Sequence, residues 1–84
     1  MSAPLFLTPI PVRLNGYANE GRLVLADGQL VAVLVRLDGD VDAAELKGRW
    51  FLEAGFGPCA VADGPVFRGL DDAEAWVEAR ILTA

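Results

Sequence analysis

The chain is poor in the side chains that carry most enzyme chemistry. Its 84 residues include no histidine, one cysteine, one lysine and one serine. Histidine is the commonest general base and metal ligand in proteins, so Ser-His-Asp and Cys-His arrangements cannot form within one copy of this chain. Lys47 lies in a polar segment, where an ammonium group is expected to stay solvated. We therefore predict a protein that is not an enzyme and that has no catalytic residues and no cofactor.

Clustered positive charge is also missing. Seven basic and twelve acidic residues give a net charge of −5, and the basic residues are scattered along the sequence. A domain that binds nucleic acid is expected to carry a positive patch, because contacts with phosphates supply much of its affinity. We therefore predict no nucleic-acid partner.

The sequence has no pattern typical of a signal peptide or a membrane span. Its apolar N-terminal stretch has no positive residue before it and is interrupted by Pro4, Pro9 and Pro11. A single cysteine cannot form an internal disulfide, which a small secreted domain usually needs. We therefore expect a cytoplasmic protein without membrane contact. The excess of arginine over lysine and the abundance of alanine, leucine and valine suggest a bacterial genome rich in GC.

The single cysteine lies in a glycine-rich segment, GFGPC, at residues 55–59. A dinucleotide-binding pattern, G-x-G-x-x-A, begins at Gly55, but Pro58 lies inside it and no helical segment follows. We therefore reject nucleotide binding and interpret the glycines as a turn. Cys59 is a candidate thiol, but a reactive thiol needs a neighbouring cation or helix N-terminus, and free cysteine is usually buried. We expect Cys59 to lie in the core.

An acidic segment, DGDVDAAE, carries Asp38, Asp40 and Asp42 at alternate positions, as in the first half of an EF-hand loop. The pattern then fails, because Ala43 stands in place of the glycine and Arg49 in place of the bidentate glutamate. Three carboxylates could still bind calcium weakly through their oxygens. We predict instead a solvated loop that keeps the neighbouring sheet edge soluble, and no metal site.

The strongest structural signal is a β-hairpin in RLVLADGQLVAVLVRL. Its Asp-Gly pair at 27–28 favours the left-handed conformations of a two-residue type I′ turn. Such a turn fixes a register in which Val24 faces Val31. Alternation then places Leu23, Leu25, Leu30, Ala32 and Leu34 on one face, and Val24, Val31, Val33, Val35 and Leu37 on the other. Because both faces of this hairpin are apolar, we expect its second strand, which follows the turn at 27–28, to be covered on both sides.

The other expected elements complete a small domain. Residues 1–9 read as an edge strand or an extended arm, because their prolines remove backbone donors. We predict a strand over residues 49–55. A helix is predicted over residues 70–82, because acidic residues lie in its first turn and its apolar residues recur at helical spacing. We predict a single α+β domain over residues 1–84. Its twisted antiparallel sheet should have four or five strands, open or partly curled into a barrel, with the C-terminal helix packed on one face.

One helix cannot cover both faces of such a sheet, so we predict a homodimer formed through the second apolar face. The candidate ligand or interface residues are the aromatic ones, Trp50, Phe51, Phe56 and Trp76. The favoured function is a non-catalytic protein-interaction or assembly module. One alternative is a small-ligand binding domain whose apolar pocket is lined by these four aromatic residues, and another is a thiol-dependent activity at Cys59.

Overall fold

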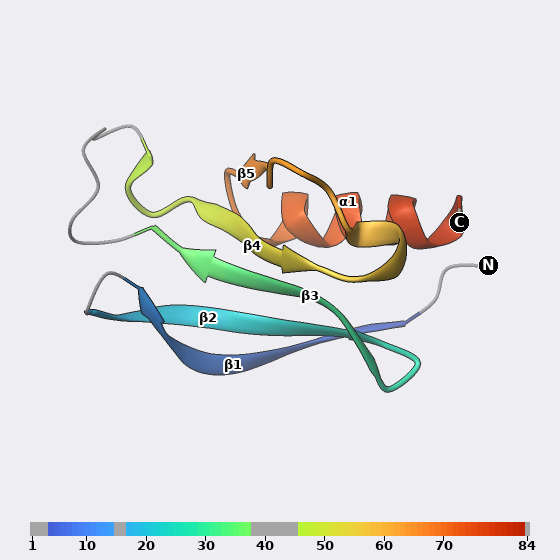
Figure 1. Cartoon of the computed structure of the whole chain (residues 1–84), viewed down its shortest axis with the longest axis horizontal. Helices are drawn as coiled ribbons and strands as arrows, with labels where there is room; N and C mark the ends of the chain where they lie inside the picture. Colours follow the sequence, from blue (N-terminus) through green and yellow to red (C-terminus); the bar gives the residue numbers. More distant parts are fainter. Residues whose placement is uncertain (1–3, 15–16, 38–45, 84) are drawn as a thin grey trace.

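The computed structural model describes residues 4–14, 17–37 and 46–83, which form one antiparallel sheet and one long helix (Figure 1). Its strands are β1 (Leu5–Leu14), β2 (Tyr17–Ala26), β3 (Gln29–Arg36), β4 (Trp50–Gly55) and β5 (Val66–Phe67). A short 3-10 helix, η2 (Gly57–Cys59), follows β4, and the α-helix α1 (Leu70–Leu82) follows β5.

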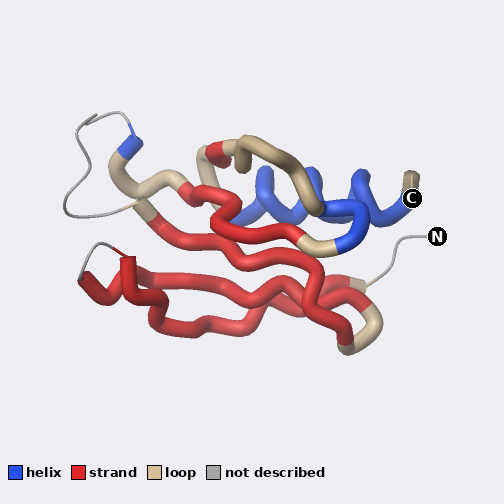
Figure 2. The backbone as a smooth tube through the Cα atoms, viewed as in Figure 1, coloured by secondary structure: helices blue, strands red, loops and turns tan. Residues whose placement is uncertain are grey.

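The described strands run in the order β1-β2-β3-β4-β5, and each neighbouring pair is antiparallel. β1 and β5 are therefore the two edges of an open sheet, which is not closed into a barrel. Figure 2 shows the strands as one layer, with α1 beside β4 and β5. The predicted α+β fold with a single C-terminal helix is confirmed, and residues 5–9 belong to the edge strand rather than to an arm.

The β2–β3 hairpin has the predicted turn but not the predicted register. Asp27 and Gly28 have φ values of 52° and 77°, as both central residues of a type I′ turn require. Beyond Leu25 a β-bulge shifts the pairing, so that Val24 faces Ala32 and Val31 is the extra residue. The predicted pairing of Val24 with Val31 is therefore wrong.

This one-residue shift regroups the two faces of the sheet, because side chains alternate along each strand. The strand residues on the side of α1 include Val24, Ala32, Leu34, Trp50, Leu52 and Phe67, which belong to the buried core. Leu23 and Leu25, predicted to share a face with Leu34, lie on the opposite face with Val33. A second bulge at Glu53 turns Ala54 to that opposite face as well, away from Leu52.

The helix α1 packs against the core, with its backbone closest to η2 and β5. It begins after Gly69, has Asp71 and Asp72 in its first turn and Arg80 in its last, and so has the charge distribution that a helix dipole favours. Ala73 and Val77 are fully buried, so the predicted apolar stripe is the face that packs on the sheet. The rings of Trp76 and Phe67 lie 5.8 Å apart in a tilted arrangement, which joins the helix to β5.

Candidate functional site

The sheet face opposite α1, here called the open face, consists of cross-strand rows of mainly apolar residues. Three of these rows are Phe6, Leu25 and Leu30; Thr8, Leu23, Val33 and Ala54; and Ile10, Gly21, Val35, Phe51 and Val66, and the pair Val12 and Asn19 continues the face beyond the third row. Directly opposed side chains have Cβ atoms roughly 4.5–5.5 Å apart, so the rows form a continuous surface. Thr8 is the polar residue within the three rows, Asn19 is polar beyond the third row, and the exposed Glu53 stands at the β4 bulge beside the second row.

Several large side chains of the open face lie in solvent. Phe6 exposes 64% of its surface, and Ile10, Leu30 and Val66 are also exposed. Together with the half-buried members of the rows, they present roughly 500 Å² of apolar surface, judged from the size of such side chains. This area lies at the upper end of the range of about 300–600 Å² for the largest apolar patch on a typical monomer.

The centre of the open face is packed more tightly than its margins. Val35 is fully buried although it lies on the face away from the helix. Its neighbour in the register is Gly21, where an added Cβ would lie 2.5 Å from Val12 Cγ2 and 2.8 Å from the Ile10 carbonyl oxygen. The missing side chain at Gly21 therefore lets β1 pack closely over β2, which curves the sheet without closing it.

Neither edge of the described sheet offers a continuous row of free backbone donors. On β1, Pro9 and Pro11 have no N–H group, and proline in a sheet is tolerated on an edge strand where that side faces solvent. On the other edge, β5 is only two residues long. A further strand would find few backbone partners on either side.

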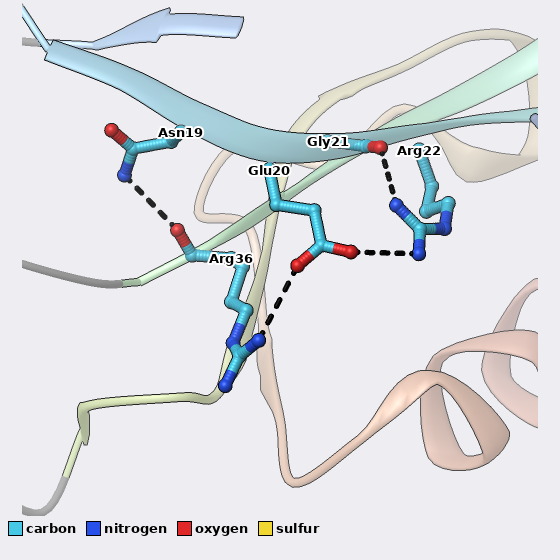
Figure 3. A network of polar contacts seen from close by, with 5 residues as sticks. All are labelled: Asn19, Glu20, Gly21, Arg22 and Arg36. Atoms are coloured by element: carbon cyan, nitrogen blue, oxygen red, sulfur yellow. Dashed lines mark hydrogen bonds and ion pairs between the residues drawn. The ribbon is translucent and has the colours of Figure 1, made fainter. Parts of the chain in front are cut away.

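A small ionic network, the arginine cluster of Glu20, Arg22 and Arg36, lies on the helix side of the sheet (Figure 3). Glu20 accepts hydrogen bonds from Arg22 at 2.8 Å and from Arg36 at 3.3 Å, and these contacts lower the pKa of Glu20, the one from Arg22 most strongly. The Arg22 guanidinium stands 5.2 Å from the centre of the Trp50 ring. The Arg22 guanidinium therefore covers part of the Trp50 ring.

The arginine cluster borders a shallow groove of about 350 Å³. Its lining includes Pro9, Pro11, Ala18, Glu20 and Arg22. Glu20 and Arg22 already bind each other at 2.8 Å, so the charges of the groove wall are engaged within the protein. Exposed ion pairs of this kind contribute little to stability, and we assign the cluster a role in joining β2 to β3.

The GFGPC segment forms a tight connection that buries the thiol. Gly57 has a φ of +58°, and an added Cβ on Gly55 would collide with the Cys59 carbonyl oxygen. The side chain of Cys59 is fully buried under α1, and Arg80 Nε donates a 2.8 Å hydrogen bond to the Pro58 carbonyl oxygen above it. Burial raises the pKa of the Cys59 thiol, and the nearby charge of Arg80 opposes this shift only in part. The expected core position of the cysteine is confirmed.

The four aromatic candidates do not meet at one place. Trp50 is buried on the helix side, whereas its neighbour Phe51 is half-buried on the open face. Trp76 is half-buried on α1, with the Arg80 guanidinium 5.3 Å from its ring centre. Phe56 is 47% exposed just before η2, where its N–H donates to the Val31 carbonyl oxygen at 2.9 Å. Of the four, Phe51 belongs to the open face.

The calcium candidates Asp38, Asp40 and Asp42 lie outside the described residues. Within residues 4–14, 17–37 and 46–83, no group of three or more histidine, cysteine, aspartate or glutamate residues is placed to hold a metal ion. The same described part of the chain has no helix that is long and apolar enough to cross a membrane.

Comparison of the chain with protein-family models, with curated proteins and with solved structures finds no match. The function must therefore be argued from the surfaces described above. The open face could have been anticipated as apolar from the alternating valines and leucines. The residues that form this face could not have been predicted, because the two bulges decide which side chains point to it. The arginine cluster carries a weak sequence signal, since Glu20 and Arg22 share a face by strand alternation.

Proposed function

We propose that the protein is a non-catalytic protein-interaction module whose contact surface is the open face. The observation that carries the proposal is the apolar surface of the open face, on which Phe6, exposed to 64%, Ile10, Leu30 and Val66 are all exposed. Large contiguous apolar patches with a polar surround are typical of surfaces that bind another protein. Glu53 and Thr8 supply polar groups at or near this surface, as the rim of an interface requires.

Association through a face fits this fold better than association through an edge. Pro9 and Pro11 remove donors from β1, and the two-residue β5 is too short to template a partner strand. Natural sheets use such devices against edge-to-edge pairing. What remains for a partner is the packed but uncovered side of the sheet, where burial of apolar area supplies the driving force.

Two features favour interaction over catalysis. The sequence has no histidine, and its single thiol is fully buried under α1, where burial raises the pKa of Cys59. A nucleophilic cysteine needs the opposite setting, with an accessible thiolate and a lowered pKa. A buried, unpaired cysteine also suits the reducing cytoplasm, which we propose as the location of the protein.

Site-specific photo-crosslinking in the cells that make the protein tests this function. A photoreactive phenylalanine analogue at Phe6 retains the aromatic ring on the open face, and the same analogue at Leu82 provides a control on α1. Both positions are exposed, to 64% and 53%. We expect protein-to-protein products from position 6 that exceed those from position 82. Equal yields from the two positions, or none from position 6, would show that the open face is not the contact surface.

A further inference from the structure

We infer that the partner of the open face is a second copy of this chain, bound face to face in a symmetric dimer. This inference rests on the interaction function proposed above. Two sheets that pack face to face lie roughly 10 Å apart and bury the side chains of both inner faces. The rows of the open face have the residue types of such an inner face, with leucine, valine, isoleucine and phenylalanine in cross-strand register.

The charge distribution allows two copies to meet. With a net charge of −5, two chains repel each other unless the contact keeps their charges apart. The three rows of the open face contain no charged residue, and Arg49, on the same face as Phe51 by alternation, lies beyond the end of the third row. Several described acidic residues lie away from this face: Asp27 in the β2–β3 turn, Glu20 in the arginine cluster, and Asp71 and Asp72 on the helix. A face-to-face dimer therefore buries apolar rows while these carboxylates remain outside the contact.

The exposed Glu53 marks the boundary of the contact. As the extra residue of the β4 bulge, it stands beside Ala54 at one margin of the second row. A carboxylate at this place suits a polar rim, because a charge that stays in water costs nothing on association. The dimer is therefore centred on the rows between β1 and β3, where Leu23 and Val33 face each other.

The size of the open face suits a dimer of moderate affinity. Roughly 500 Å² of apolar surface from each copy would bury about 1,000 Å² in total, before the polar rim is counted. Specific interfaces bury about 1,200–2,000 Å², and weak or transient ones fall below that range. We therefore expect a dissociation constant on the order of micromolar for the isolated protein.

Sedimentation equilibrium on purified wild-type protein and two matched variants tests the inference. Phe6→Lys places a charge in the first row of the open face, and Leu82→Lys makes the same charge change on the exposed side of α1. Since both side chains are more than half exposed, neither variant loses a core contact, and circular dichroism checks that both fold. Concentrations from about 1 to 500 µM bracket the expected dissociation constant.

For the wild type we expect the mass to rise from 8.9 kDa toward twice that value with concentration. Phe6→Lys should weaken the dimer by roughly 10- to 100-fold, because it removes an exposed aromatic contact and places a charge against an apolar surface, whereas Leu82→Lys should leave it unchanged. If the wild type stays monomeric at all concentrations, or if both variants weaken the dimer equally, the inference that a second copy binds the open face is wrong. If a monomeric wild type is crosslinked from position 6 to a different protein in cells, the interaction function stands and only this inference fails.

Discussion

Replacing Gly55 with alanine should destabilise the protein more than any other single methyl group added to the GFGPC segment. An added Cβ at this position would collide with the Cys59 carbonyl oxygen and would lie 2.6 Å from the Cys59 carbonyl carbon. Backbone hydrogen bonds hold that carbonyl in place, from Cys59 N–H to the Phe56 oxygen and from Ala60 N–H to the Gly57 oxygen, both at 3.1 Å. The η2 turn must therefore move away from β4 or lose a bond.

The magnitude of this effect follows from two contributions. Overpacking in a well-packed site costs about 1–3 kcal/mol, and a backbone hydrogen bond that is broken adds about 1 kcal/mol. We therefore expect Gly55→Ala to lower the free energy of unfolding by about 2–4 kcal/mol. With a urea m-value of about 1–1.5 kcal/mol per molar, this lowers the midpoint by roughly 2 M.

Gly57→Ala provides the matched control in the same segment. Nothing lies within 4 Å of a Cβ at Gly57, so the cost is limited to its φ of +58°. A left-handed alanine costs about 1–2 kcal/mol, and the reduced entropy of the unfolded chain offsets about 0.4–1 kcal/mol of this. Urea unfolding at one fixed protein concentration measures both variants. If Gly55→Ala is no more destabilising than Gly57→Ala, that result would contradict the close packing of η2 against β4.

Three further predictions concern the thiol, the arginine cluster and the core. Because Cys59 is fully buried, a disulfide reagent should label it far more slowly in native protein than in urea; equal rates would contradict its burial. The pKa of Glu20 is lowered, so its stabilising contribution is present above the ordinary pKa of 4.5 and is lost as the pH falls through the lower folded-state value. The urea midpoints of wild type and Glu20→Gln should accordingly differ by a small amount at neutral pH, as expected for an exposed ion pair, and converge in acid; a difference that does not change with pH would refute this role. Leu34→Ala should lower the free energy of unfolding by about 2–5 kcal/mol and Leu82→Ala by under about 0.5 kcal/mol, because of these two residues only Leu34 is buried. Similar losses of stability in thermal unfolding would contradict the core position of Leu34.

Local signals were sufficient to predict the helix and the hairpin turn. The helix over residues 70–82 follows from acidic residues in its first turn and apolar residues at helical spacing, and the structure has the same bounds. The turn at Asp27 was predicted from the backbone freedom of an Asp-Gly pair, and the positive φ of both Asp27 and Gly28 confirms it. Both elements are determined by residues close together in the sequence, so no knowledge of distant contacts was needed.

The faces of the sheet could not be predicted in the same way, because they depend on bulges. Val31 lies among other apolar residues, and nothing in its type distinguishes an extra residue from a paired one. A single such residue exchanges the two faces for the rest of the strand, so that Leu23 and Leu25 do not share a face with Leu34 as predicted. Long-range pairing of the strands decides where the bulge is accommodated.

An apolar sheet face away from the helix was predicted, and of the four aromatic candidates Phe51 lies on it. An uncovered apolar sheet face follows from valine and leucine on both sides of β3, together with only one predicted helix. Phe6 was not singled out, because its place opposite Leu25 depends on the β1–β2 register. Size alone does not bring the aromatic residues together, because adjacent residues such as Trp50 and Phe51 point to opposite faces of a strand.

An isotope-filtered NOE experiment on a mixture of labelled and unlabelled protein tests the role of the open face most directly. At concentrations where the protein is dimeric, we expect contacts between copies from the Phe6 ring and the Ile10 and Leu30 methyl groups to side chains of the second and third rows. Contacts confined to Leu82, Val61 or the helix surface would place the interface elsewhere and contradict the proposed use of this face.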